Sequence, residues 1–313
     1  MPIRTPSWSS GKRMKLSAKV SRRWMKSKGG VTPPLRVNIM LPNFLVIGSQ
    51  KAGTTSLYRI LKQHPQIFMA DKKEINFFFK DEEHARGAEA YSQHFTDCAN
   101  QLVRGEASPG YICHPEAPAR IHALIPDAKL ILTLRDPIKR AISQYWDNRR
   151  HLNEPLTFAQ ALDAYLSDEY HPDKIGYFSR GVYMRYIRKY LEYFPRENLL
   201  ILLFEDMISD PVTFYKSIFT FLGVDTDFES EDFDEAFNPT EVWKNPFYQI
   251  LLRRPRYQTR VPAKLRRLFY WGRKMPFSAP PIDEASLQRL VDFYRRWNDE
   301  LRKFLGVELA DWD

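Results

Sequence analysis

The sequence lacks most features of a secreted or membrane-spanning protein. It contains two cysteines in 313 residues, Cys98 and Cys113, which are too few for a disulfide framework. No stretch approaches the 18 apolar residues that a transmembrane helix needs, and the first residues lack the apolar core of a signal peptide. These absences favour a reduced, cytoplasmic setting and leave a single Cys98–Cys113 bridge open.

Acidic residues are missing from two long stretches. Residues 1–36 contain ten Lys or Arg and no Asp or Glu, whereas the rest of the chain balances 37 basic with 38 acidic residues. The net charge of +9 therefore belongs to a basic arm on a nearly neutral body. Because residues 1–40 also lack a sustained apolar period, we expect a disordered arm, either a solvated tail or a segment for nucleic acid, membrane surface or targeting. A second acid-free stretch, 242–282, favours anionic ligands.

Beyond residue 40, apolar runs alternate with segments of helical period. With 43% hydrophobic residues the chain can bury a sizeable core. The alternation predicts an α/β fold with a central parallel sheet flanked by helices in three layers, formed by residues 41–313 as one domain with a helical, basic last third. The expected strands are 44–47, 67–70, 101–108, 129–134 and 199–204. The expected helices are 54–63, 117–124, 138–150, 158–166, 183–194, 211–222, 247–254, 263–271 and 282–305.

The segment after the first expected strand has the composition of a phosphate-binding loop. Residues 48–53 form a glycine-punctuated turn between a buried strand and a helix, and amides at the start of a helix attract anions. Lys51 adds a positive charge, and Thr54, Thr55 and Ser56 add hydroxyl donors. Strand, loop and helix together predict a P-loop-like site.

The lysine of a nucleoside-triphosphate loop is missing from its usual place. That motif, GxxxxGK[ST], has lysine directly after its second glycine, where this chain has Thr54. The lysine of this loop, Lys51, stands two residues before Gly53. We therefore expect a phosphate-like ligand other than ATP. A P-loop kinase of small molecules is the first alternative, and a nucleic-acid-binding module, which we disfavour, is the second.

Polar motifs also follow the other expected strands. In open parallel sheets, ligands bind beyond the carboxyl ends of the strands. The motifs should therefore meet on one rim of the sheet, where Lys51 and Arg135 would form two basic anchors. The histidines have no metal-like spacing, so we expect no metal. The motifs lie at 72–79, 106–111, 135–143 and 205–206.

Taken together, these motifs resemble the sulfotransferases that use 3′-phosphoadenosine 5′-phosphosulfate, most of all the heparan-sulfate-type and related bacterial enzymes. Residues 48–57, Gly-Ser-Gln-Lys-Ala-Gly-Thr-Thr-Ser-Leu, are similar to the family's 5′-phosphosulfate loop. Residues 134–145 are similar to its 3′-phosphate element, in which an Arg and a Ser eight residues later hold the phosphate. The resemblance spans roughly residues 42–306. It implies the following donor ligands: Lys51, Ala52, Gly53, Thr54, Thr55, Ser56, Arg135 and Ser143.

The resemblance also implies a reaction. The family transfers a sulfuryl group from this donor to a hydroxyl or amine of an acceptor, for which we favour a carbohydrate. Residues 73–78, Lys-Glu-Ile-Asn-Phe-Phe, resemble the family's Lys-Glu-x-His-Phe-Phe. Glu74 is therefore the predicted general base, Lys51 would neutralise the leaving phosphate, and Lys73 would assist. Without the membrane anchor of a Golgi enzyme, the chain resembles a cytoplasmic bacterial member, and nothing in the sequence sets its oligomeric state.

The chain departs from the family pattern at several positions. Asn76 replaces a frequent histidine, and Ala107 stands where heparan-type enzymes often have a lysine. Structural alternatives also stay open, because Arg135 could pair with Asp136 or Glu205, and Glu74 could pair with Lys73 or cap a helix. The family's Lys-Gly-Arg lid has a looser counterpart here, and its predicted 3′-phosphate ligands are Gly272, Arg273 and Lys274.

Overall fold

The computed structural model describes most of the chain after residue 38, in one compact unit that begins at Ile39. The predicted arm up to Asn38 and the predicted helices 247–254 and 263–271 lie outside the described residues and stay predictions. For the short strands at 241–243 and 274–276 only the backbone is described. The described residues are 39–98, 101, 103–151, 153–167, 176–233, 241–243, 274–276, 279–309 and 312.

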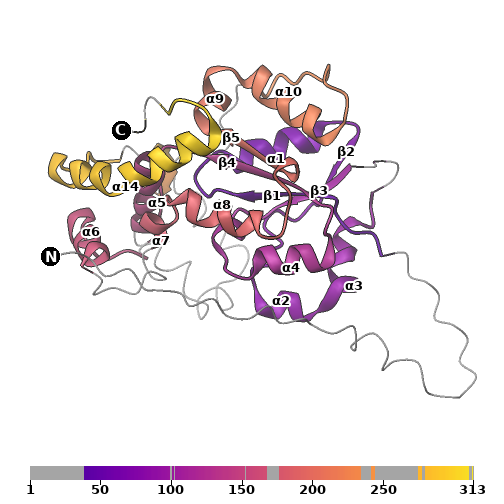
Figure 1. The fold of residues 1–313 in the computed structure, drawn as a ribbon, viewed down its shortest axis with the longest axis horizontal. Helices are drawn as coiled ribbons and strands as arrows, with labels where there is room; N and C mark the ends of the chain where they lie inside the picture. The colour runs from indigo at the N-terminus through magenta and orange to yellow at the C-terminus, as the bar shows by residue number, and fades with distance from the viewer. Residues whose placement is uncertain are drawn as a thin grey trace, which may run out of the picture. The chain divides into compact units, whose positions relative to one another are not determined.

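The core of the described unit is a five-stranded parallel sheet (Figure 1). Its order is β2-β3-β1-β4-β5, so the chain leaves β1 towards one edge and returns as β4 on the other side of β1. The carboxyl ends of β1 and β4 therefore form the topological switch point, where such sheets bind their ligands. The strands are β1 (Phe44–Gly48), β2 (Ile67–Met69), β3 (Val103–Ala107), β4 (Lys129–Leu134) and β5 (Leu199–Leu203).

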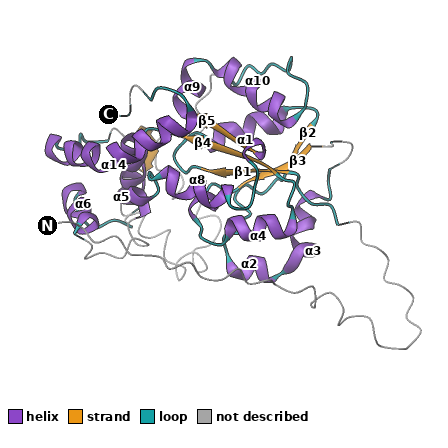
Figure 2. Ribbon diagram, viewed as in Figure 1, coloured by secondary structure: helices purple, strands orange, loops and turns teal. Residues whose placement is uncertain are grey.

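Helices and short 3₁₀ turns surround the sheet, as Figure 2 shows. The helices are α1 (Thr54–Gln63), α2 (Asp81–Ala85), α3 (Gly87–Ser92), α4 (Ala117–Leu124), α5 (Pro137–Arg150), α6 (Phe158–Leu166), α7 (Gly176–Ser179), α8 (Tyr183–Leu191), α9 (Phe204–Ser209), α10 (Pro211–Leu222) and α14 (Glu284–Leu305). The 3₁₀ turns are η2 (Gln93–Phe95), η3 (Tyr111–Cys113) and η4 (Arg196–Asn198).

The alternating side chains of β1 account for the three layers. Phe44 and Val46 pack into a core with α1 and α10, whereas Leu45 and Ile47 pack into a core with α4 and α8. All four side chains are fully buried, because successive side chains of a strand point to opposite faces and each face carries a helical layer. A third core joins α5, α6, α7 and α14. The predicted three-layer α/β fold with a parallel sheet is confirmed.

Several elements differ from the predictions. The short helices α2 and α3 were not predicted, because five or six residues show too little helical period. Phe204 begins α9 rather than ending the last strand, since an apolar run hides the boundary. The strands β6 (Glu241–Trp243) and β7 (Lys274–Pro276) pair antiparallel and were also missed. Both cysteines are free thiols. Of the described helices, none has the length and apolar character needed to cross a bilayer.

Gly105 lets the ring of Phe44 lie across the middle of the sheet, and this contact gives a test of the fold. The two residues are register partners on β3 and β1, and an added Cβ at Gly105 would lie 2.3 Å from Cζ of Phe44. We expect Gly105→Ala to lower the free energy of unfolding by about 1–3 kcal/mol in urea titrations. The double variant with Phe44→Leu should lose less than the sum of the single variants, and additive losses would contradict this packing.

Candidate functional site

The loop after β1 turns the chain sharply into α1. Lys51 and Gly53 have positive φ angles of 70° and 74°. At Gly53 an added Cβ would also lie 2.8 Å from Sδ of Met207 and 2.9 Å from Phe204, so this position requires glycine. α1 then begins at Thr54 with no side-chain cap and no acidic residue in its first turn. The positive end of the α1 dipole therefore faces the loop, and no carboxylate in the first turn of the helix neutralises it.

The loop is fastened to the neighbouring strand and to two helices. The amide and the hydroxyl of Ser49 both donate to the carbonyl of Thr133 on β4, at 2.8 and 2.9 Å. The side-chain oxygen of Gln50 accepts hydrogen bonds from Arg180, just after α7, and from Gln144 on α5 at 3.5 Å. Gln144 is itself fixed by the fully buried Arg140, whose Nη1 donates to its oxygen at 3.1 Å. The loop thus has a defined position before any ligand arrives.

The other predicted loop residues differ in how far they are exposed. The side chains of Ala52, Thr54 and Ser56 are buried, whereas Thr55 and Lys51 are partly exposed. The loop can therefore offer Lys51 and Thr55 to a ligand directly, while the buried residues shape the turn.

Arg135, the residue after β4, reaches across to this loop. Its Nη1 donates to the carbonyl of Lys51 at 3.0 Å, and its guanidinium lies 4.8 Å from the ring centre of Phe204. Burial lowers the pKa of Arg135, against the opposing effect of Glu205, but a guanidinium stays charged at neutral pH. Its buried Nε has no hydrogen-bond partner among the described residues. A partly buried cation with an unused buried donor suits an anionic ligand.

Two carboxylates near Arg135, those of Asp136 and Glu205, accept hydrogen bonds from backbone amides instead of pairing with its guanidinium. Glu205 accepts a hydrogen bond from the amide of Asp136 at 3.0 Å, and Asp136 accepts from the amides of Ile138 and Lys139 as the N-cap of α5. Within the described chain, neither Asp136 nor Glu205 forms an ion pair with Arg135. The ion pair of Arg135 with Asp136 or Glu205, which the sequence left open, is therefore not observed. The two carboxylates instead fix the backbone at the start of α5.

One face of α5 continues the site. Side chains three and four residues apart lie on the same face of a helix, and this spacing places Ser143 in a row with Lys139, Trp146, Asp147 and Arg150. All five residues line one pocket. Of this row, only Ser143 was predicted from the sequence, although the helical period counted from Ser143 predicts the others as well.

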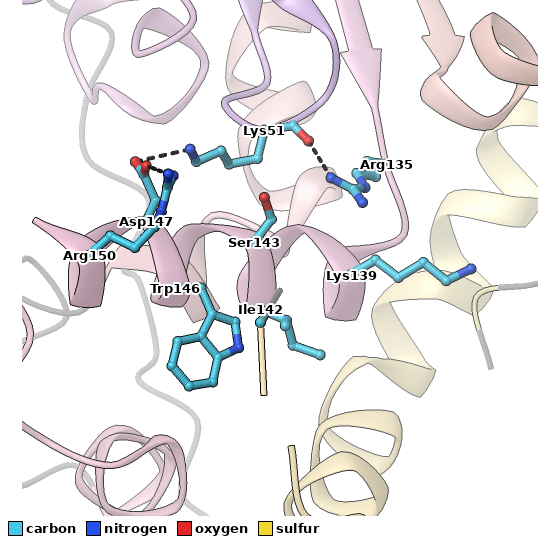
Figure 3. Close-up of a pocket in the computed structure, with 9 residues that line it drawn as sticks. Lys51, Arg135, Lys139, Ile142, Ser143, Trp146, Asp147 and Arg150 are labelled. Atoms are coloured by element: carbon cyan, nitrogen blue, oxygen red, sulfur yellow. Dashed lines mark hydrogen bonds and ion pairs between the residues drawn. The ribbon is translucent and has the colours of Figure 1, made fainter. Parts of the chain in front are cut away.

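The pocket brings the predicted anchors together. It has a volume of about 320 Å³, and Lys51 and Arg135 complete its wall together with Ile142 and Ala279. Figure 3 shows Lys51, Arg135 and Ser143 around one space, with the Ser143 hydroxyl directed towards the loop. Four of the nine lining residues are Lys or Arg and one is acidic. The pocket is thus predominantly basic and lies at the switch point between β1 and β4.

Asp147 partly neutralises this charge. Its Oδ2 lies 2.9 Å from Nζ of Lys51, and its Oδ1 accepts a hydrogen bond from Arg150 at 2.6 Å. Burial favours the neutral form of Asp147, but Lys51, His151 and Arg150 outweigh burial and hold its pKa below the usual range. The carboxylate is therefore ionised at neutral pH, and an anion that contacts Lys51 must compete with it.

Glu74 lies on the loop after β2. Its amide donates to the carbonyl of Ala107 at the end of β3 at 2.9 Å, and its φ angle is 61°. Its exposed carboxylate pairs with Lys73 at 3.0 Å, which is one of the alternatives left open by the sequence. Glu74 is not among the described residues that line the pocket of Lys51, but β3, which holds its loop, is the direct neighbour of β1.

The predicted 3′-phosphate ligands at 272–274 are largely outside the part of the chain that the structure describes. Gly272 and Arg273 lie outside the described residues, and Lys274 is described only as backbone of β7. Within the described ranges, no group of three or more His, Cys, Asp or Glu is placed to hold a metal ion.

Comparisons with known proteins identify the family. A sulfotransferase-domain family model matches residues 41–242. Mouse bifunctional heparan sulfate N-deacetylase/N-sulfotransferase 4 is 32% identical over 288 residues, which are 87% of this chain and 31% of that protein. Human heparan sulfate glucosamine 3-O-sulfotransferase 3B1 is 29% identical over 278 residues, 87% of this chain and 65% of that protein. The chain thus spans between about a third and two thirds of the length of these curated relatives.

The solved structures agree with this result. A crystal structure of a sulfotransferase from Alicyclobacillus acidocaldarius aligns with a TM-score of 0.64 and 26% identity, covering 87% of this chain and 99% of that chain. The family model covers every strand of the parallel sheet, the loop around Lys51 and all of α5. The chain therefore belongs to the sulfotransferase family and is a transferase.

Proposed function

We propose that this sulfotransferase takes its sulfuryl group from 3′-phosphoadenosine 5′-phosphosulfate and transfers it to a hydroxyl or amine of a carbohydrate. The observation that carries the proposal is the pocket in which Lys51, Arg135 and Ser143 meet. These residues come from two motifs more than 80 positions apart in the chain, each of which resembles a phosphate-binding element of the family.

The residues of the pocket fit a nucleotide with anionic groups at both its 5′ and 3′ positions. Lys51 and the uncapped start of α1 would hold the 5′ end, while Arg135 and Ser143 would hold the 3′-phosphate. The buried Nε of Arg135 supplies a donor that is still unused among the described residues. We also retain Gly272, Arg273 and Lys274 as proposed ligands of the 3′-phosphate.

Sulfuryl transfer depends on positioning and on stabilising charge, as phosphoryl transfer does. The donor would supply the sulfuryl group: the bond between its sulfur and the bridging oxygen of the 5′-phosphate breaks as the acceptor oxygen or nitrogen bonds to sulfur, and adenosine 3′,5′-bisphosphate leaves. Lys51 and the amides at the start of α1 would neutralise the negative charge that develops on this phosphate. Glu74 would accept the proton of the attacking hydroxyl or amine, and Lys73, 3.0 Å away, would orient its carboxylate or contact the transferred group.

The named relatives support a carbohydrate acceptor. One is named for N-sulfation of heparan sulfate and the other for 3-O-sulfation of its glucosamine. An amine and a hydroxyl of a glycan are therefore both reasonable acceptors for this chain. A kinase remains the alternative to test, because the fold and the loop resemble those of P-loop proteins.

Nucleotide selectivity distinguishes the sulfotransferase from the kinase. Adenosine 3′,5′-bisphosphate carries both phosphates of the proposed donor, so at about 100 times its Kd it should raise the melting temperature by about 5 °C. ATP with magnesium at equal concentration should have a much smaller effect, because the loop lacks the lysine after its second glycine. Thermal-shift measurements in which only ATP–magnesium stabilises the protein would contradict the proposal.

The two basic anchors can be tested separately. Lys51→Ala and Arg135→Ala each remove a charged donor from the pocket and should weaken binding of adenosine 3′,5′-bisphosphate by about 10- to 100-fold in calorimetric titrations. Lys62→Ala is the matched control, because Lys62 belongs to α1, the helix that follows the Lys51 loop, but pairs with Asp71 outside the pocket. Wild-type affinity in either pocket variant would place that anchor elsewhere.

Glu74→Gln should separate catalysis from donor binding. The amide keeps the shape of the side chain but cannot accept a proton, so turnover should fall by about 100- to 10,000-fold while nucleotide affinity stays unchanged. Turnover is measured as transfer of labelled sulfate to de-N-sulfated heparin, which presents an amine, and to fully desulfated heparin, which adds hydroxyls. Glu82→Gln, on the exposed side of α2, is the control. Near-wild-type turnover of Glu74→Gln would remove its role as base.

A further inference from the structure

We propose that Glu106 is a positioning residue that holds the Glu74 loop in its conformation and thereby controls turnover through Glu74. This inference rests on the proposed role of Glu74 as general base. Glu106 belongs to β3, is fully buried and lies opposite Leu45 of β1 in the sheet. This carboxylate does not line the pocket of Lys51 and is not the proposed general base.

Neutral donors surround the Glu106 carboxylate. Its Oε1 accepts hydrogen bonds from the hydroxyls of Tyr91 at 3.0 Å and Tyr111 at 2.6 Å, and its Oε2 accepts one from Ser108 at 2.6 Å. The backbone of Ile75 also favours the charged form of this carboxylate. A carboxylate has about four acceptor positions, and three hydrogen bonds are made here. Their donors come from α3, from η3 and from the residue after β3.

The surroundings keep the two tyrosines as donors. Burial, together with the nearby Glu106 charge, raises the pKa values of Tyr91 and Tyr111 well above their usual range. Both phenols therefore stay protonated and hold Glu106 from one side. Burial also raises the pKa of Glu106 itself, while its hydrogen bonds act in the opposite direction. Burying a carboxylate costs free energy unless it is hydrogen-bonded. A carboxylate at this position in the core therefore suggests a specific role.

Two amides of the Glu74 loop bond to residues at the end of β3. The amide of Glu74 donates to the carbonyl of Ala107 at 2.9 Å, and that of Asn76 donates to the hydroxyl of Ser108 at 3.0 Å. The Ser108 hydroxyl in turn donates to Glu106. Glu106 thus ties the loop to the sheet through Ser108.

The backbone of the loop shows why such a tie is needed. Glu74 and Asn76 have φ angles of 61° and 59°, in the left-handed region that residues with a side chain rarely adopt. Such conformations persist only where the surroundings hold them. Without the Glu106 carboxylate, the loop should relax towards negative φ and carry the Glu74 side chain away from its position. The donor pocket should stay intact, because its loop is fastened to β4, α5 and Arg180 instead.

The experiment combines hydrogen exchange with a double-mutant cycle. In Glu106→Gln we expect deuterium uptake of a peptide covering residues 72–80 to accelerate at least tenfold, with uptake of α1 unchanged. Turnover with de-N-sulfated heparin should fall at least tenfold, while the Kd for adenosine 3′,5′-bisphosphate stays within twofold. In the Glu74→Gln background the same substitution should cause no further loss, because Glu106 acts through Glu74.

A purely structural role predicts other results. It would lower turnover equally in both backgrounds or weaken nucleotide binding in parallel, and either result, like unchanged uptake of the 72–80 peptide, overturns the inference. If Glu74→Gln loses turnover but Glu106→Gln does not, only this inference fails. If Glu74→Gln turns over at the wild-type rate, the proposed base and this inference fail together.

Milder variants keep the test decisive if Glu106→Gln does not fold. Tyr91→Phe removes one donor to Glu106 and should raise uptake and lower turnover about two- to fivefold. Tyr294→Phe is the matched control, because Tyr294 is also fully buried but lies in another core, where its hydroxyl donates to the carbonyl of Phe178 at 2.6 Å. Equal effects of the two phenylalanine variants would overturn the inference.

Discussion

The pairing of β1 with β4 is the contact on which the candidate site depends. It lies at the one position in the sheet where the chain reverses direction along the strand order, so the loops that follow the two strands share one rim. Ser49 continues the ladder by donating twice to Thr133, and Arg135 then donates to the carbonyl of Lys51. Two cations more than 80 residues apart in sequence thereby reach the same pocket. The remaining strands and the helices hold the paired strands β1 and β4 in place.

The pocket brings together four basic side chains and one carboxylate that partly neutralises them. Lys51, Arg135, Lys139 and Arg150 would repel one another in a pocket without a counter-charge, and Asp147 supplies one within 2.9 Å of Lys51. The proposed anionic nucleotide would take over that counter-charge on binding. The basic residues would then stabilise the charge that grows on its 5′-phosphate during the proposed transfer.

Two buried charged groups in the core are connected by hydrogen bonds to loops of the candidate site. Glu106 and Arg140 are both fully buried, one carboxylate and one guanidinium, and each is satisfied mainly by neutral partners. Arg140 acts through Gln144 on the phosphate loop, and Glu106 acts on the loop of Glu74. Buried polar groups of this kind are costly to maintain, and here each lies one contact away from a proposed functional loop.

From the sequence alone we predicted the five strands of the parallel sheet, most of the helices, the loop between β1 and α1, and the resemblance to the family. These rest on local periods and on motifs that are continuous in the chain, such as the apolar run of β4 or the residues around Lys51. The structure adds the contacts of Asp147 with Lys51 and of Tyr91 with Glu106. In both pairs the two side chains belong to different elements, and a local period reports which face of one element a residue lies on but not which residue of another element it touches. The order of the strands, not their composition, brought these side chains together.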